Sequence, residues 1–246
     1  WGYQTYPHST DTLTPEYQPM WVTVTSDVRI PEGIDLEYGI QGTNLTDRTA
    51  SAGDCSFALD NSIRNSGAAA GYYNPDSTAL REGFRIGTPV LIGFTWKGTR
   101  YYKAHGWIDE IQVVPGPGRS AVKVHVSDWL DYAARTTVAT TGVVQSQYSD
   151  QLFNLIMDRV ARQPNRRLLT EFGSVAYPYA FDQSPEESMA TLSEINRLCM
   201  SDLSYSYLKG DTLGGGTLVF EPGGFQSTGI RWSADQTDIR ELSIEH

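Results

Sequence analysis

The sequence has few cysteines and no long apolar run. Cys55 and Cys199 are the two cysteines among 246 residues, and their wide separation matches no disulfide framework. Each continues the apolar pattern of its segment, so we expect two buried free thiols. No apolar run approaches the roughly 20 residues of a transmembrane helix, so we expect no membrane span. The first residues also lack the basic, apolar and small-residue order of a secretory signal.

Basic residues are outnumbered by acidic ones. The chain has 19 Lys and Arg against 29 Asp and Glu, which gives a net charge of −10. Proteins that bind duplex nucleic acid gain most of their affinity from Lys and Arg on phosphates, so this balance argues against specific nucleic-acid binding. The densest basic stretch, residues 159–167, is more typical of a solvated helix end than of a binding patch.

Motifs of enzymes and metal sites are also missing. The sequence has no G-x-S-x-G elbow, no Walker loop and no Cys-x-x-Cys pair. His105 and His125 fall on neighbouring expected strands, but their positions about the turn at residues 115–120 do not match, and no second ligand lies two or four residues away. We therefore expect no metal site and no cofactor.

Two pairs of carboxylates deserve comparison with glycosidases, which need two carboxyl groups about 5 to 9.5 Å apart. Asp109 and Glu110 are adjacent in an expected strand, so their side chains point to opposite faces. In the second pair, Asp128 and Asp131, Asp128 lies just past a strand, where a cap or a turn is its more usual role. We therefore expect no catalytic residue and no enzymatic activity.

The N-terminal half alternates apolar and polar residues, as half-buried strands do. Residues 1–19 have no period and are expected to form an arm, whereas alternation runs through residues 22–30, 34–40, 55–59 and 122–126. Residues 87–111 predict a hairpin, because Val90, Ile92, Phe94 and Trp96 share one side and Lys97-Gly98 supplies a two-residue turn. The connection up to about residue 83 is long, so we expect it to carry a contact or to be mobile.

Helical periodicity begins after residue 140. One helix is expected over residues 149–162, capped by Ser149 or Asp150, with Leu152, Leu155, Ile156 and Val160 on its apolar stripe. A second helix is expected from the cap at Ser184, with Pro185 at its first position and Glu187 completing a capping box. Its expected apolar face is Met189, Leu192, Ile195, Cys199 and Leu203. Residues 204–208 and 216–221 predict a hairpin, and residues 238–246 a last strand.

These elements predict an α+β protein that is mainly antiparallel β. We expect an N-terminal arm (residues 1–19), an antiparallel β-barrel-like domain (20–137) and a smaller α/β domain with two helices and a hairpin (138–246). Among the many aromatic residues, Tyr72, Tyr73, Tyr101 and Tyr102 are candidates for the core or a subunit interface rather than for a sugar-stacking surface.

Several motifs of the first domain occur in a recognisable order. An A-G strand that ends in Asn precedes an Asn-Pro loop, and G-x-P-V, W-x-G and G-x-I-D segments follow. A V-x-x-x-D segment then enters a short expected helix. The positions are Ala52, Gly53, Leu59 and Asn61; Asn74 and Pro75; Gly87, Pro89 and Val90; Trp96 and Gly98; Gly106, Ile108 and Asp109; and Val124 and Asp128.

This ordered set resembles the N-terminal pattern of minor tail proteins from long-tailed bacteriophages and prophages, and the resemblance extends over about residues 20–222. It implies a baseplate hub or tail-tip protein that closes the tail tube, located in the virion tail after assembly in the host cytoplasm. It also implies a homotrimer, in which β-barrel domains of three subunits form a ring, with other tail proteins as partners. In that setting Gly106 would permit a bend or bulge in the barrel wall.

Two other functions remain open at this point. A carbohydrate-binding β module for host-surface adhesion would present an exposed aromatic row and would depend on Tyr101 or Tyr102. A cell-wall hydrolase would need two close carboxylates in a cleft and would depend on Asp109 or Asp128. The order of the motifs favours the structural tail protein over both.

Overall fold

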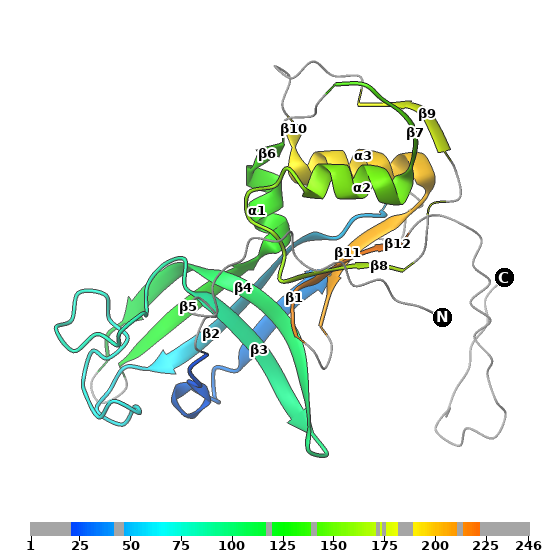
Figure 1. Cartoon of the computed structure of the whole chain (residues 1–246). Coiled ribbons are helices and arrows are strands. Elements are labelled where there is room, and N and C mark those ends of the chain that lie inside the picture. The colour runs from blue at the N-terminus through cyan, green and yellow to red at the C-terminus, as the bar shows by residue number, and fades with distance from the viewer. Residues whose placement is uncertain are drawn as a thin grey trace, which may run out of the picture.

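A computed structural model describes residues 21–41, 47–116, 120–138, 142–170, 173, 176–181, 189–210 and 214–221 of the chain. The expected arm and the expected strand at residues 238–246 lie outside these residues. Figure 1 shows a large sheet on one side and, next to it, helices and smaller sheets formed by the C-terminal part of the chain.

The first part of the chain forms a five-stranded antiparallel sheet. Its strands are β1 (Ile34–Gly39), β2 (Ser51–Asp60), β3 (Pro89–Trp96), β4 (Thr99–Val114) and β5 (Ala121–Asp128). Their order across the sheet is β1-β2-β5-β4-β3. The expected hairpin is confirmed: Trp96 pairs with Thr99, and Lys97 and Gly98 both have positive φ angles of 47° and 80°, as a two-residue turn of this kind requires.

One face of this sheet carries a hydrophobic core. Cys55, Phe57 and Leu59 of β2 are buried, and each is paired with a buried valine of β5. The predicted alternation in these two strands is therefore confirmed. Burial of such paired apolar side chains is the main stabilising contribution of a sheet face.

The sheet is open, so a closed barrel is not found in the described residues. β1 and β3 are its two edges, and no strand pairing joins them. The sheet is nevertheless curled, because Leu36 of β1 and Ile92 of β3 line the same cavity of about 20 Å³. Two bulges contribute to the bending, since Lys103 and Asp109 of β4 have no partner in the neighbouring strand.

The first expected strand, at residues 22–30, is not formed. The structure has a short 3₁₀ helix there, η2 (Thr25–Asp27), followed by a turn at residues 30–32. The alternation was misleading because Asp27 is buried and its carboxylate accepts hydrogen bonds from Ser26 and Ser66. Such local side-chain bonds compete with the ladder of a strand.

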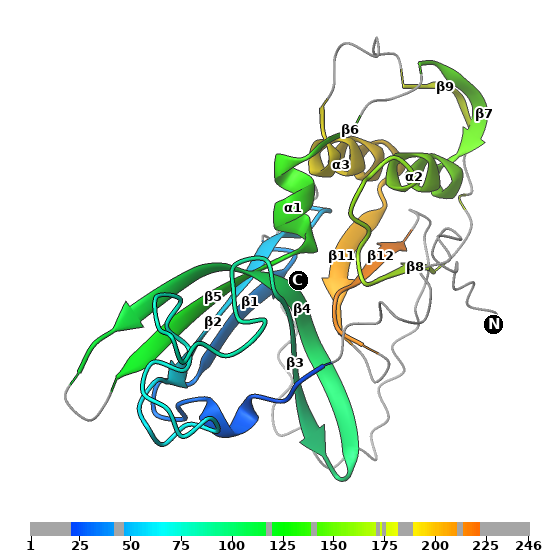
Figure 2. The ribbon, with the colours of Figure 1, turned by 60° about the vertical axis from the view of Figure 1, so that its left-hand side comes forward.

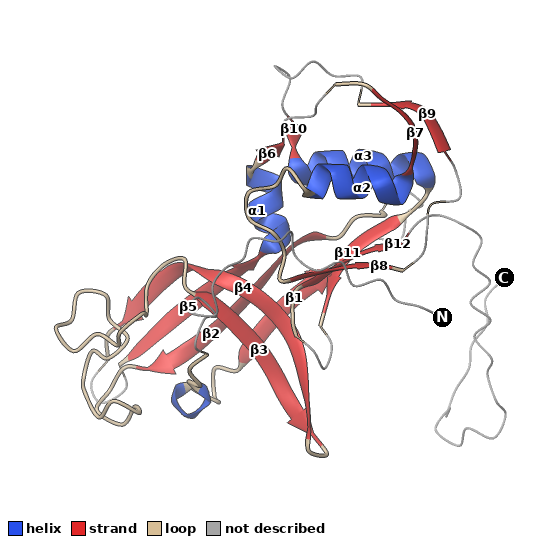
Figure 3. Ribbon diagram, viewed as in Figure 1, coloured by secondary structure: helices blue, strands red, loops and turns tan. Residues whose placement is uncertain are grey.

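Helices and short strands make up the second part of the chain. In order they are α1 (Trp129–Arg135), β6 (Thr137–Val138), β7 (Val144–Tyr148), α2 (Ser149–Met157), β8 (Arg166–Leu169), β9 (Ala176–Ala180), β10 (Met189–Ala190), α3 (Thr191–Asp202), β11 (Tyr205–Lys209) and β12 (Thr217–Glu221). Figure 3 shows α2 and α3 side by side above the sheet formed by β11, β12 and β8. The expected hairpin is β11 and β12, which pair antiparallel.

The two expected helices exist, but their ends differ from the prediction. α2 is preceded by Tyr148, whose backbone N–H donates to the Gln151 side chain at 3.0 Å, so neither Ser149 nor Asp150 is the cap. α3 begins at Thr191 and Met189 lies in β10, while the expected cap at residues 184–187 is outside the described residues.

The C-terminal end of α3 also departs from the expected apolar face. Leu203 has a left-handed conformation with φ 52° and is 60% exposed. The chain reverses here into β11, and a left-handed residue is a usual way to end a helix. The basic stretch at residues 159–167 was expected to be a helix end. It follows α2, but its last two residues belong to β8, which pairs parallel with β12.

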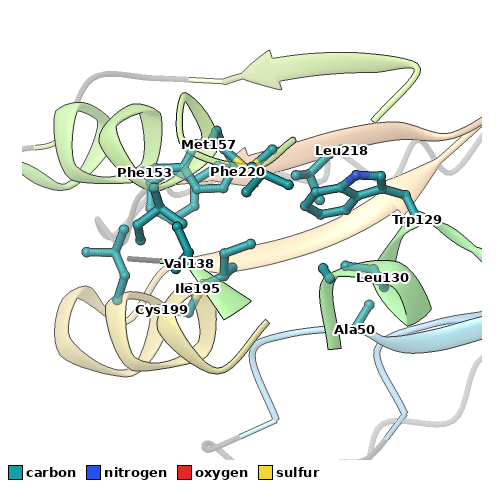
Figure 4. Close-up of a cluster of buried hydrophobic side chains, with 14 of the residues drawn as sticks. Ala50, Trp129, Leu130, Val138, Phe153, Met157, Ile195, Cys199, Leu218 and Phe220 are labelled. Atoms are coloured by element: carbon teal, nitrogen blue, oxygen red, sulfur yellow. The ribbon is translucent and has the colours of Figure 1, made fainter. Parts of the chain in front are cut away.

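The second core lies between the helices and the β11–β12–β8 sheet. Figure 4 shows Phe153 and Phe220 facing each other, and their rings stack with centroids 4.6 Å apart. Trp129 of α1 and Ala50 belong to the same buried cluster. The cluster therefore takes residues from both sides of the expected domain border at residues 137 and 138, and the border itself stays a prediction.

Candidate functional site

The long connection after β2 covers one end of the core face and is held there by Tyr73. This side chain is fully buried and packs edge-on against Phe84 with ring centroids 5.1 Å apart. Its hydroxyl donates to the carboxylate of Asp27, and the Arg81 guanidinium donates to the same hydroxyl at 3.2 Å. The connection thus carries a contact, one of the two outcomes expected for it.

The ionisation of these groups follows from their surroundings. Burial alone would raise the pKa of Asp27, but hydrogen bonds from Ser66, Tyr73 and Ser26 outweigh it and lower that pKa. Burial and the hydrogen bond to Asp27 raise the pKa of Tyr73 to about 12. Asp27 is therefore a buried carboxylate that anchors two connections. Its only signal in the sequence is a polar residue within an alternating segment.

Asn61 and Pro75 shape the same connection. The Asn61 side-chain oxygen accepts the backbone N–H of Tyr73 at 2.8 Å, and its backbone carbonyl accepts the N–H of Gly71 at 3.0 Å. Pro75 follows Asn74, whose carbonyl accepts the N–H of Ser77 at 2.9 Å and so closes a turn. These motif positions set the path of the backbone.

Gly53 and Asp128 meet at the junction of the sheet with α1. One carboxylate oxygen of Asp128 accepts the Gly53 N–H at 2.9 Å, and the other accepts the N–H of Leu130 at 2.8 Å and of Asp131 at 3.2 Å. Asp128 is therefore the N-cap of α1, the role expected from its place after a strand. Burial raises the pKa of this carboxyl to about 6, although these hydrogen bonds act in the opposite direction.

A side chain at Gly53 has no room. A Cβ atom there would lie 2.6 Å from the Asp128 carboxylate and 2.9 Å from the backbone oxygen of Glu37. Gly106 is similar, because its Cβ would lie 2.3 Å from the backbone oxygen of Ser127. Gly106 thus serves the close approach of β4 to β5, and the bulge proposed at this residue is found instead at Lys103 and Asp109.

The remaining motif positions also lie in backbone turns, strand ends or the core. Gly87 has a φ of 84° and donates its N–H to the Ile108 carbonyl at 2.7 Å. Pro89 begins the edge strand β3, where a residue without an N–H is tolerated. Leu59 belongs to the buried core face.

Asp109, His125 and Ser127 form a polar group on the other face of β4 and β5. The Asp109 carboxylate accepts a hydrogen bond from the Ser127 hydroxyl and contacts His125 Nδ1 at 2.7 Å. Burial would raise the pKa of Asp109, but these two partners lower it. The pKa of His125 is raised, because its contacts with Asp109 and Asp54 outweigh the effect of burial.

This group has the residue types of a Ser-His-Asp triad but not its arrangement. In a triad the His lies between the Ser and the Asp, whereas here the Asp is bonded to both of the others. The group therefore provides no activated hydroxyl. The other pair considered for hydrolysis is also engaged, because Asp128 caps α1 and Asp131 forms an ion pair with Arg135 at 2.7 Å.

The two cysteines are buried free thiols, as expected. Burial raises the pKa of Cys55 to about 12 and that of Cys199 to about 11, so neither is a reactive thiolate at neutral pH. In the described ranges no three His, Cys, Asp or Glu side chains converge as a metal site would need. His105 pairs with Leu91, and His125 pairs with Glu110 at another part of the sheet. None of the helices described here has the length and apolarity to cross a bilayer.

The far end of the β3–β4 hairpin, residues 93–103, is called the hairpin tip below. Figure 2 shows it projecting away from the rest of the sheet. Phe94 is 47% and Trp96 61% exposed, and Phe94 stacks on Tyr101 with ring centroids 5.6 Å apart. Of the four tyrosines that were candidates for the core or an interface, Tyr73 is fully buried. The other three, Tyr72, Tyr101 and Tyr102, are half-buried.

Cations lie over the rings of the hairpin tip. The Lys97 ammonium is 5.8 Å from the Trp96 ring centroid, the Lys103 ammonium is 5.5 Å from that of Phe94, and Arg100 is 5.8 Å from that of Tyr102. The alternation of aromatic and basic residues in FTWKGTRYYK is the sequence signal for this surface. It was present in the sequence and its basic residues were overlooked.

Comparison with known proteins gives weak similarities to several solved structures, of which two are described. One is the 43 kDa tail protein of prophage MuSo2 from Shewanella oneidensis, with 14% identity, a TM-score of 0.44 and coverage of 76% of this chain and 53% of that chain. The other is a tail protein from Neisseria meningitidis MC58, with 12% identity, a TM-score of 0.43 and coverage of 76% and 48%. No protein-family model and no curated protein matches the chain. The chain spans about half the length of these two proteins.

Proposed function

We propose that this chain is a structural protein of a phage tail, part of the baseplate hub or tail tip that closes the tail tube. Its partners in this proposal are further copies of itself, as a trimer, and other tail proteins. The proposal starts from the ordered motifs of the sequence, which resemble those of minor tail proteins. It includes no catalytic step and no cofactor.

The observation that carries the proposal is the role of the motif positions. Gly53 and Asp128 join the sheet to α1, Asn61 fixes the long connection, and Gly106 permits close approach of two strands. Each of these positions holds the backbone, and none presents a reactive group. The motifs therefore support a role based on shape and contacts, because none of these positions supplies a group for catalysis.

A carbohydrate-binding module is less well supported. A sugar stacks on a free aromatic face, but in the hairpin tip Lys97 lies over Trp96, and Phe94 is stacked on Tyr101 and approached by Lys103. These cations would have to move before a sugar ring could bind. The bonded state of Asp109 and Asp128 likewise gives no support to a hydrolase.

Two measurements test the proposal. Mass spectrometry of purified virions, with immunogold electron microscopy against this chain, is expected to find it at the distal end of the tail. Light scattering of the purified chain is expected to give about 82 kDa for three copies of 27.3 kDa. Absence of the chain from intact particles would contradict the structural role, and glycan-array binding by a monomer would support the adhesion module instead.

A further inference from the structure

The hairpin tip combines exposed aromatic rings with cations that have no acidic partner. Lys97, Arg100 and Lys103 are exposed, and within the described part of the chain none of them forms an ion pair. Exposed aromatic side chains grouped in this way mark contact surfaces more often than scattered apolar residues do. In a chain with a net charge of −10, this locally positive patch is complementary in charge to an acidic patch on a second copy.

The opposite edge of the same sheet carries an acidic group. Glu37 of β1 pairs directly with Asp54 of β2, so two carboxylates lie across from each other on one face. Asp35 is two residues before Glu37 and therefore shares that face. All three side chains are exposed. We call this group the acidic edge.

The acidic edge is destabilised by its own charges. Like charges directly opposite each other in a sheet repel. His125 offsets part of the repulsion, since its Nε2 atom lies 3.6 Å from Asp54. Glu37 accepts a hydrogen bond from the Gln41 amide, which is neutral. Cations supplied from outside would relieve the repulsion that remains.

We propose that the hairpin tip of one copy docks on the acidic edge of a second copy. Lys97 and Lys103 then face Asp35, Glu37 and Asp54, and Phe94 and Trp96 lose contact with water at the same interface. Arg100 pairs with Thr95 and therefore points to the other side of the hairpin from Phe94 and Trp96. This inference rests on the proposed function, because it names the contact by which copies of the tail protein would assemble.

The contact has a defined symmetry. Two different patches meet, so the interface is heterologous, and successive copies either close into a ring or continue as a filament. A ring is the form that a tail-tube component requires. Because the attraction is between exposed charges, it is expected to weaken as salt rises.

A charge-swap experiment with the whole chain tests the contact. The hairpin variant is Lys97→Glu/Lys103→Glu, and the edge variant is Asp35→Lys/Glu37→Lys/Asp54→Lys. Each alone is expected to weaken self-association at least tenfold in sedimentation velocity or light scattering. A mixture of the two variants is expected to associate again. The basic hairpin tip of the edge variant can dock on the acidic edge of the hairpin variant, although neither variant can form this contact with its own copies.

A matched control separates the effect of charge at the hairpin tip from the effect of the net charge of the chain. Arg64→Glu/Arg85→Glu changes the net charge as much as the hairpin variant does, but at exposed positions outside both patches. This control is expected to associate like the unchanged chain. Circular dichroism melting curves check that all variants are folded, which is expected since the substituted side chains are on the surface.

The outcomes separate this inference from the proposed function. If the unchanged chain associates and the hairpin and edge variants associate equally well, the interface is wrong while the tail function stands. If the unchanged chain is a monomer at every concentration and salt, docking of a second copy is wrong, and the presence of the chain in virions decides the tail function separately. Association lost equally in the control would also overturn the specific contact.

Discussion

The two ends of the β3–β4 hairpin have the same alternation but different surroundings. Val90 and Ile92 are half-buried against the core that the long connection covers, whereas Phe94 and Trp96 continue the same side of the strand into solvent. Periodicity therefore identifies the side of a strand on which apolar residues lie, but not whether another segment covers that side. The covered end is expected to carry stability, and the hairpin tip to carry contacts.

The largest test of this comparison is Tyr73→Ala at the covered end. Removing a fully buried aromatic side chain leaves a cavity and takes one hydrogen bond from the buried Asp27 carboxylate, so the free energy of unfolding should fall by about 3 to 5 kcal/mol. Urea denaturation measures the loss. Tyr73→Phe keeps the ring and is expected to lose less, and an effect of Tyr73→Ala below about 1 kcal/mol would show that the connection does not hold the core.

A smaller loss of stability is expected for Asn61→Ala. The substitution removes the acceptor of the buried Tyr73 N–H, and an unpaired buried donor costs about 1 to 3 kcal/mol. Asn74→Ala is the matched control, because Asn74 accepts from Asp76 in an exposed turn. Equal losses in urea for both variants would contradict the role of Asn61 as the anchor of the connection.

The pH dependence of stability tests the junction of Gly53 and Asp128. The folded pKa of Asp128, about 6, is above the ordinary value of 3.8, so its protonation favours the folded state. Stability is therefore expected to rise by about 1 kcal/mol as pH falls from 7.5 to 5, and to be lost as pH rises through 6. His125, with a raised pKa, acts in the same direction.

Asp128→Asn isolates the contribution of Asp128. The amide does not titrate, so the change of stability between pH 7.5 and 5 should become smaller, leaving the part due to His125. Asp27 and Asp109 have lowered pKa values and titrate below this window. The free energy of unfolding is measured by denaturation at each pH. If its pH dependence is the same in Asp128→Asn as in the unchanged chain, titration of Asp128 does not contribute to stability.

The comparison also shows how far the sequence predicts the structure. Local signals were sufficient for β2, β5, the hairpin turn at Lys97-Gly98 and the existence of α2 and α3, because alternation, turn chemistry and helical stripes are properties of neighbouring residues. Asp128 was expected as a cap and is one. What local signals could not give was tertiary: the parallel pairing of β8 with β12, the open edges of the sheet, and the burial of Asp27.

The candidate surface was predicted only in part. The aromatic residues of the hairpin were recognised in the sequence, but Tyr73 and Tyr101 were treated alike, although one is fully buried and the other half-buried on a projecting hairpin. The difference depends on the path of a connection fixed by Asn61, which alternation does not encode. The acidic edge depends on the pairing of Glu37 with Asp54, and pairing between strands needs a register that the sequence alone did not supply.

The smallest expected effect on stability belongs to Trp96→Ala in the hairpin tip. Trp96 is 61% exposed and its ring contacts Lys97. The free energy of unfolding measured in urea should therefore change by less than about 0.5 kcal/mol. Self-association should nevertheless weaken, because the ring belongs to the proposed contact. Ile63→Ala, at a position 69% exposed and far from the hairpin, is the control and should leave both unchanged. A large loss of stability in Trp96→Ala would mean that the ring is covered within its own chain, and the contrast between a stabilising end and a contacting end would then fail.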